Sequence, residues 1–278
     1  MKQYRTREGD VTGADTRTQL TTVGSETAPG PLLVPQKATH IIGVIASHIS
    51  SMAAATGYSA FLRIEGAGLK NGPETLAIGA GGMAVATGGN GAVKPVYIPL
   101  NLEVIPGQEI QLFAEMAGTD VGLISVNATL VFADGLPSGE SLNKTFTVEG
   151  DITTADTKTN LTTQGSVSAP SPVTPPNATK IRRIVVAATS EGLADGACNL
   201  FLRLGGNAVQ GGEQVLSIGA CARIAVQTGS DAAPQVVNAT VLDNLDIEVS
   251  ASDTLSVAAE AGGTDTGTVH VVVTLIYE

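Results

Sequence analysis

The sequence predicts an all-β protein made of two tandem antiparallel β-sandwiches, for which a jelly roll is favoured over an immunoglobulin-like arrangement. Three observations lead to this prediction. The chain repeats itself almost from end to end, its apolar residues alternate with a period of two, and turn-forming residues recur at short intervals.

The internal duplication decides the domain organisation. Residues 8–22 return as 149–163, Phe61-Leu62-Arg63 returns as Phe201-Leu202-Arg203, and parts of 114–122 return within 259–267. Each copy has the size of an ordinary domain. We therefore expect a first sandwich over residues 1–133, a polar linker rich in Gly, Pro and Ser over 134–148, and a second sandwich over 149–278.

About eight short strands are expected in the first copy. In order they are 19–23, 39–47, 59–65, 74–78, 83–87, 96–104, 109–116 and 123–132. The turns around them contain Pro29-Gly30-Pro31, Asn71-Gly72-Pro73, Gly88-Gly89-Asn90-Gly91, Pro106-Gly107 and Gly118-Thr119-Asp120. The alternation is clear in 108–116 and in 269–275, as is typical of half-buried antiparallel strands, and no window shows convincing amphipathic helix spacing.

Composition excludes several classes of protein. Hydrophobic residues make up 43% of the chain and charged residues 15%, which excludes an intrinsically disordered protein. Aromatic residues make up 3% and Trp is absent, so a binding face of stacked aromatic rings has little material. The net charge is -11 and no basic run occurs, so we expect no direct binding of nucleic acid.

The N-terminal residues lack the apolar segment of a secretory signal peptide. The most apolar stretch, 41–61, is interrupted by Ser, His and Thr residues, so we expect no transmembrane segment. Cys198 and Cys221 have no counterparts in the first copy; they could form one disulfide, although buried free thiols are the favoured interpretation.

Two acidic pairs are repeated and are the candidate calcium ligands: Glu115 with Asp120, and Glu260 with Asp265. A calcium site needs several converging oxygen ligands. The favoured interpretation is therefore simpler: each Glu is a solvated strand residue, and each Asp suits a tight turn. The same interpretation as turn residues applies to Asp10, Asp15, Asp151 and Asp156.

Arg63 and Arg203 follow Phe-Leu inside predicted strands, where a charge is unexpected unless it is paired or lies at an edge. Because both members are repeated, we predict that Arg63 pairs with Glu115 and Arg203 with Glu260, within about 4 Å. An exposed arginine that makes an intermolecular contact is an equal alternative.

Catalytic motifs are not found in the sequence. No nucleophile elbow, zinc-protease motif, phosphate-binding loop or dinucleotide fingerprint occurs, and the histidines do not recur between the two copies. We therefore expect no enzyme activity, no catalytic residues and no cofactor.

Two fused β-sandwiches in an acidic chain of small residues are typical of a building block. The duplicated architecture resembles the double jelly-roll major capsid proteins of the lineage that includes adenovirus and the lipid-containing phages. This resemblance implies a viral coat subunit located in the virion. It also implies a homotrimer that forms a pseudo-hexamer, because each subunit contributes two sandwiches.

The alternative function is a tandem β-sandwich that binds or adheres, for example to glycans, or that forms part of a tail or spike. The small number of aromatic residues argues against a carbohydrate platform. The state of association of the purified chain distinguishes the two functions.

Overall fold

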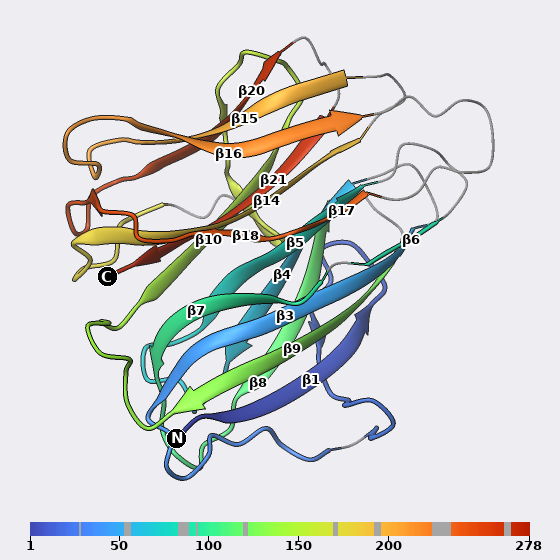
Figure 1. Ribbon diagram of the computed structural model, residues 1–278, viewed down its shortest axis with the longest axis vertical. Helices are drawn as coiled ribbons and strands as arrows, with labels where there is room; N and C mark the ends of the chain where they lie inside the picture. Colours follow the sequence, from blue (N-terminus) through green and yellow to red (C-terminus); the bar gives the residue numbers. More distant parts are fainter. Residues whose placement is uncertain are drawn as a thin grey trace.

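The computed structural model describes residues 1–27, 29–52, 57–82, 89–92, 94–118, 122–168, 172–191, 196–223, 235–263 and 268–278. All strand pairings in these residues are antiparallel, and they form four sheets (Figure 1). The predicted all-β sandwich class is confirmed. The described segments contain no helix that could span a membrane.

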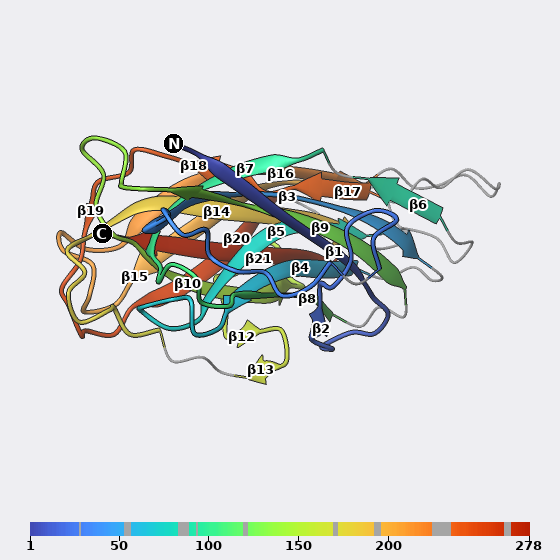
Figure 2. The same ribbon diagram turned by 90° about the horizontal axis from the view of Figure 1, so that it is seen from below.

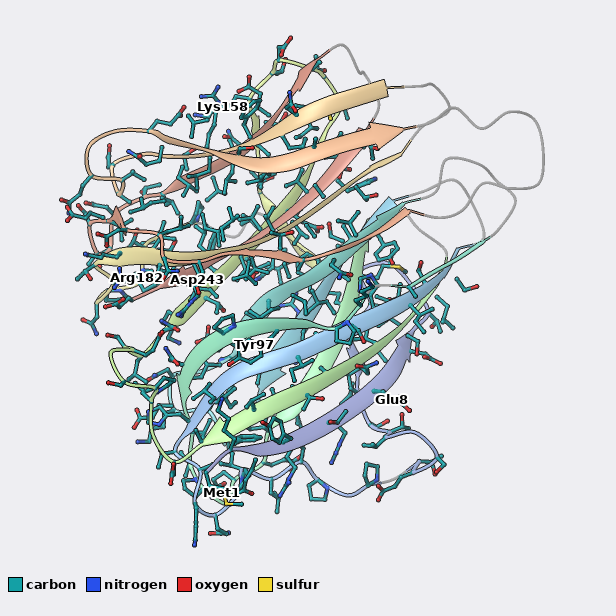
Figure 3. All side chains as sticks on the ribbon, in the orientation of Figure 1. Met1, Glu8, Tyr97, Lys158, Arg182 and Asp243 are labelled. Atoms are coloured by element: carbon teal, nitrogen blue, oxygen red, sulfur yellow. The ribbon has the colours of Figure 1, made fainter. Side chains whose placement is uncertain are left out.

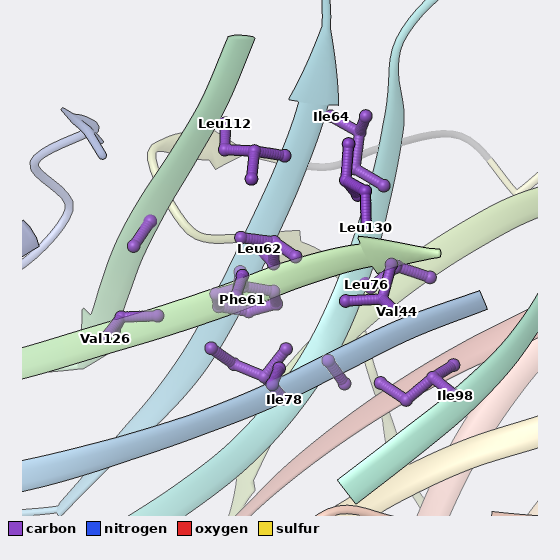
Figure 4. Close-up of a cluster of buried hydrophobic side chains, with 14 of the residues drawn as sticks. Val44, Phe61, Leu62, Ile64, Leu76, Ile78, Ile98, Leu112, Val126 and Leu130 are labelled. Carbon is purple, nitrogen blue, oxygen red and sulfur yellow. The ribbon is translucent and has the colours of Figure 1, made fainter. Parts of the chain in front are cut away.

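The first copy of the repeat forms two sheets. Sheet A has the order β1 (Gln3–Val11), β9 (Leu123–Ala133), β3 (His40–Met52) and β6 (Gly89–Ala92), and β7 (Val96–Glu103) also pairs with β3. Sheet B has the order β17 (Gln235–Asn238), β5 (Glu74–Gly82), β4 (Gly57–Glu65), β8 (Gln111–Gly118) and β2 (Thr18–Gln19). Buried side chains such as Val44, Leu62 and Leu130 fill the space between them (Figure 4).

The second copy forms the other two sheets. Sheet C has the order β13 (Val167–Ser168), β12 (Thr163–Gln164), β10 (Lys144–Ile152), β21 (Thr268–Tyr277), β14 (Lys180–Glu191) and β18 (Thr240–Leu242), with β19 (Ile247–Glu248) also paired with β14. Sheet D has the order β11 (Thr159–Asn160), β20 (Ser256–Gly263), β15 (Gly196–Gly205) and β16 (Gln214–Arg223). β17 comes from the second copy but extends sheet B of the first.

Sheets A and C are equivalent, and so are sheets B and D, because their strands pair in the same register. In sheet A Thr6 lies opposite Thr129, and in sheet C Thr147 lies opposite Thr274. In the same way, Arg63 lies opposite Thr75 in sheet B, and Arg203 lies opposite Val215 in sheet D.

Sheet C covers an open edge of the first sandwich. β17 pairs with Gly79–Gly82, and among the described strands none pairs with the earlier part of β5 on that side. Strands β10, β14 and β21 lie against β5 instead, in the middle of the long axis of the molecule (Figure 1). Four side chains of sheet C join the buried cluster of the first sandwich: Val185, Ala187, Val272 and Ile276.

Most predicted strands of the first copy are present, but three differences have physical causes. β1 was not predicted, because its polar sequence covers a sheet edge and is held by pairing along its whole length with β9. The predicted linker 134–148 runs into β10, where Lys144–Val148 pair with β21. The strand predicted over 19–23 shortens to β2, and the one over 83–87 lies outside the described residues.

The interpretation of the four aspartates as turn residues is half correct. Asp15 and Asp156 have φ values of 51° and 53°, as expected for turns. Asp10 and Asp151 lie in β1 and β10, so for these two the interpretation is wrong: each pairs with a partner strand.

Candidate functional site

The contact between sheet C and β5 is made by threonine side chains that bind the backbone of the open edge. Thr75 N donates to Thr145 Oγ1 at 3.3 Å, and Ala77 N donates to Thr274 Oγ1 at 2.8 Å. Thr147 Oγ1 donates to Thr75 O at 2.6 Å. Without a neighbouring strand these backbone groups would be unsatisfied, so the threonines replace the missing strand.

Thr147 and Thr274 also bind each other, with their Oγ1 atoms 2.7 Å apart. Because the Thr147 hydroxyl already donates to Thr75, the Thr274 hydroxyl donates to Thr147. A continuous chain of hydrogen bonds therefore runs from Ala77 N through both hydroxyls to Thr75 O. Both threonines are fully buried.

The buried Glu74 anchors the end of the same contact. Its carboxylate accepts hydrogen bonds from Thr145 N at 2.9 Å and from Thr145 Oγ1 at 2.6 Å. Lys144 Nζ lies 2.9 Å from the other carboxylate oxygen. These donors come from residues 144 and 145, which the sequence assigns to a linker.

The structure brings Arg63 and Glu115 together at the border of the two copies. Arg63 Nε donates to Glu115 Oε2 at 2.8 Å, and the Glu115 side chain is 0% exposed. Arg63 Nη2 also donates to Gln164 O at 3.2 Å, and Ser166 N donates to the Glu115 carboxylate. The β12–β13 hairpin of the second copy therefore covers the ion pair.

Gly165 is at the tip of this hairpin, with φ of 55°. A Cβ atom there would overlap the Glu115 carboxylate. Figure 2 shows β12 and β13 projecting away from the other strands of sheet C toward the side of the molecule where β2 lies. The hairpin reaches the ion pair only because its tip carries no side chain.

The structure also brings Arg203 and Glu260 together, but on the outside of sheet D. Arg203 Nε lies 2.5 Å from Glu260 Oε2, and the two side chains are 27% and 18% exposed. Arg203 Nη1 donates to Glu213 at 2.9 Å, and the hydrogen bonds that Arg203 donates to Glu260 and Glu213 raise its pKa. Lys158 binds Glu213 as well, and the hydrogen bond from Lys158 is the first cause of the lowered pKa of Glu213.

The interpretation of Glu115 as a solvated residue is wrong, because the second copy buries it. Among the described residues, no three His, Cys, Asp or Glu side chains are placed to hold a metal ion. Asp120 and Asp265, the other members of the candidate calcium pairs, lie outside the described residues.

Cys198 is buried in β15, and the strand register sets it opposite Cys221 in β16.

A group of carboxyls lies near the hairpin, and its only sign in the sequence is the repetition of Glu8 as Glu149. Burial raises the pKa of Glu149 to about 7; hydrogen bonds from Gly165 N and Ser59 oppose this shift, and Asp151 and Asp15 add to it. Burial, followed by the nearby Glu115, raises the pKa of Asp15. His270 Nδ1 lies 2.6 Å from Asp151.

Both surfaces of the contact between the copies recur in part elsewhere, where no other described strand covers them. On the outer face of sheet A, Thr6 and Thr129 share a hydrogen bond of 2.8 Å, as Thr147 and Thr274 do in sheet C. At the β16 edge, apolar side chains of the second core are more exposed to solvent than the equivalent side chains of the first core. Leu216, Ile218 and Leu242 are only partly buried, whereas their counterparts Leu76, Ile78 and Ile98 are at most 1% exposed.

No protein-family model and no curated protein sequence matches this chain. Solved structures match at low identity. Recombinant N-glycanase F (PNGase F) matches with a TM-score of 0.41 and 9% identity, over 99% of this chain and 95% of that one. PNGase F from Flavobacterium meningosepticum, a glycosylasparaginase, matches with a TM-score of 0.40 and 10% identity, over 99% and 96% of the two chains.

A protein of Sulfolobus Turreted Icosahedral Virus also matches, with a TM-score of 0.23 and 14% identity, over 99% of this chain and 57% of that one. At these values the likeness concerns the β fold alone. It gives no support for the adenovirus lineage in particular.

The expectation that the chain has no enzyme activity is corrected by the same comparison. Solved structures that match along nearly the whole chain include a peptide-N(4)-(N-acetyl-beta-D-glucosaminyl) asparagine amidase. The absence of sequence motifs is not sufficient ground for that expectation.

Proposed function

We propose that the chain is a structural subunit that assembles with further copies of itself, as the subunit of a viral coat does. One observation carries this proposal. Two copies of one fold bind each other within the chain through a sheet face and a strand edge, and among the described residues a second face and a second edge of related build have no other copy against them.

Three copies of the chain would supply six sandwiches, which fits a pseudo-hexameric coat unit in a virion. The setting in a virus rests on the resemblance to double jelly-roll coat proteins. The formal net charge of -11 fits a coat that does not hold its genome by direct contact with phosphates. The same charge makes free subunits repel one another, so association is expected to increase with ionic strength.

Size-exclusion chromatography with electron microscopy tests the proposal. The purified chain, concentrated at moderate ionic strength, should give discrete oligomers, rings or shells. A chain that remains a 28.0 kDa monomer at every concentration and ionic strength contradicts it.

A role directed at glycans is the second candidate, and two features favour it. A groove of about 610 Å³ lies between β1 and the segment around 29–36, with the exposed Tyr4 and the charged Arg5 and Glu26 in its lining. In addition, burial raises the pKa of the Glu149 carboxyl, which lies two residues from Asp151, to about 7, and a carboxyl with a raised pKa is what general acid catalysis by a carboxyl pair requires.

Two assays test this second candidate. A glycan array detects binding, and mass spectrometry of an N-glycosylated peptide incubated with the chain detects release of the glycan. If release occurs and Glu149→Gln abolishes it, the second candidate is supported. If neither binding nor release occurs, it is rejected.

A further inference from the structure

We propose that the outer face of sheet A binds the open β16 edge of a second copy of this chain. This contact would repeat between chains the contact that joins the two halves of one chain. The inference rests on the proposed function and identifies the two surfaces through which the subunits would assemble.

The first argument concerns the face. Thr6 and Thr129 occupy the same register in sheet A as Thr147 and Thr274 in sheet C. Both pairs are joined through their hydroxyls, at 2.8 and 2.7 Å. The threonine pair that binds β5 in the covered contact is therefore already present on sheet A, whereas Tyr4 stands at the position of Thr145.

Apolar side chains surround this threonine pair on sheet A as well. Ile45 stands where sheet C has Val185, and Val131 stands where it has Ile276. Tyr97, on β7, is 45% exposed and occupies the position of Val241, which packs against the first core (Figure 3). Of these three side chains Tyr97 is the exposed one, whereas Ile45 is half-buried and Val131 is already buried. Covering Tyr97 with a second surface would gain free energy.

Two positions make the proposed contact more polar than the one within the chain. Ser47 replaces Ala187, and Asn127 replaces Val272. The contact between chains should therefore be weaker than the internal one and reversible, as an assembling subunit requires.

The second argument concerns the edge. β16 is the last strand of sheet D, and Val215 and Ser217 occupy the register positions of Thr75 and Ala77. Their backbone groups face outward in the same way, and Val215 is 49% exposed. Leu216 and Ile218 lie beside them and are only partly buried, so the second core is partly exposed to solvent here. A sheet face packed against this edge would bury both side chains.

The third argument concerns the hairpin. Gly24 has φ of 54° and Gly165 has φ of 55°, so both copies form the same tip. Gly165 lies against the buried Arg63–Glu115 pair, whereas the space around the Cβ position of Gly24 is empty. In the proposed contact Gly24 approaches the Arg203–Glu260 pair of the second copy, which is still partly exposed.

The contact joins two different surfaces, so each chain retains one free face and one free edge after binding. Association of this kind produces a closed ring if the rotation between copies closes, and a filament if it does not. β6 pairs with β3 of its own copy. The proposed contact therefore consists of sheet face, strand edge and hairpin, without the exchange of a strand that β17 makes.

These surfaces are tested by placing a charge on each of them separately and then opposite charges on both, which should restore the contact. The variants are Thr6→Lys on the face, Val215→Glu on the edge, and the double variant. The matched control is Asn160→Lys, which places the same charge on β11, an exposed strand at the opposite edge of sheet D. Sedimentation equilibrium of the full chain measures association, and circular dichroism with thermal unfolding verifies the fold of each variant.

Each single variant should weaken association by about tenfold or more, because an uncompensated charge enters a packed contact. The double variant should recover most of this loss, and the control should associate as the unmodified chain does. If the chain associates but both single variants leave association unchanged, or the double variant recovers nothing, these surfaces are wrong while the proposed function stands. If the unmodified chain does not associate, the proposed function fails as well.

Discussion

The pairs Arg63–Glu115 and Arg203–Glu260 have the same chemistry in different surroundings. The first is covered by the β12–β13 hairpin, with Glu115 fully buried, and the second is partly exposed on sheet D. Arg63→Met would leave a buried carboxylate without its cation, which typically costs about 3–5 kcal/mol. Chemical denaturation should show this loss for Arg63→Met and a much smaller loss for the matched variant Arg203→Met, and equal losses would contradict the assignment.

Two glycines with the same backbone conformation form a second matched comparison. Gly165→Ala and Gly24→Ala both place a Cβ atom at a positive φ, which costs on the order of 1 kcal/mol. Only the alanine at 165 also meets the Glu115 carboxylate. The free energy of unfolding should therefore fall by more for Gly165→Ala, by roughly 1–3 kcal/mol in addition, since the overlap displaces a packed group.

The proposed contact between chains makes a further prediction for the same pair of variants. Gly24→Ala should weaken association between chains more than it destabilises the monomer, because the tip at Gly24 would then meet the Arg203–Glu260 pair of another chain. Sedimentation equilibrium measures this effect, and unaltered association would count against a role for the hairpin in assembly.

Glu149 makes stability depend on pH. Its pKa in the fold is about 7, above the ordinary value of 4.5, so the folded chain binds more protons than the unfolded chain between these values. Stability from this group is complete below the ordinary value and is lost as the pH rises through about 7. Burial lowers the pKa of His48 to about 4, so His48 acts in the opposite direction, but only below about 6.5.

Urea denaturation between about pH 6.5 and 8 isolates the contribution of Glu149. The free energy of unfolding should fall over this range, by roughly 1 kcal/mol or less, because the larger part of the contribution is lost between the ordinary pKa and about 7. Glu149→Gln, which cannot ionise, should reduce the fall. A profile that is equally steep in Glu149→Gln would show that another group is responsible.

The sequence identified both arginine–glutamate pairs because their members recur together, and repetition within one chain reports on shared local geometry. It did not identify the burial of Glu115 or the raised pKa of Glu149. Both depend on the second copy lying against the first, and a single sequence does not show how two copies pack.

At the scale of elements, threonine side chains of β10 and β21 replace a strand beside β5. Thr147→Val removes the hydroxyl that binds Thr75 O and leaves this buried carbonyl unsatisfied, at a cost of about 1–3 kcal/mol. Thr6→Val, the equivalent change on the uncovered face, should have little effect on the monomer. Thermal unfolding of both variants measures the difference, and equal stabilities would contradict the role given to Thr147.

Strands with regular apolar alternation, such as β8 and β9, could be predicted, because each has one face toward a core. β1 could not, since its residues are mostly polar and its pairing with β9 decides its structure. The sequence assigns the beginning of β10 to the linker for a related reason: Lys144 and Thr145 are polar because they bind Glu74 of the first copy rather than solvent.

At the scale of the whole molecule, the two copies share one buried cluster, to which Val185 and Val272 of the second copy contribute. Opening the second sandwich would therefore expose the first core along β5. We predict a single cooperative unfolding transition in scanning calorimetry, with calorimetric and van't Hoff enthalpies that agree. Two separate transitions would show that the copies unfold independently.

The duplication explains this shared core and also the surfaces left at the two ends of the molecule. Figure 1 shows β15 and β16 at one end of the long axis and β1 and β9 at the other. The equivalence of the sheets in the two copies can be predicted from the repeated sequence. The packing of the face of sheet C against the open edge of β5 cannot, because that edge becomes evident only in the three-dimensional structure.

Hydrogen exchange at four backbone amides gives the most direct test that one contact serves both within and between chains. The amides of Thr75 and Ala77 should be protected at every protein concentration, because sheet C binds them. Those of Val215 and Ser217 should exchange rapidly in dilute monomer and become protected when the chains associate. Rapid exchange at Val215 and Ser217 in the fully associated protein would contradict the account.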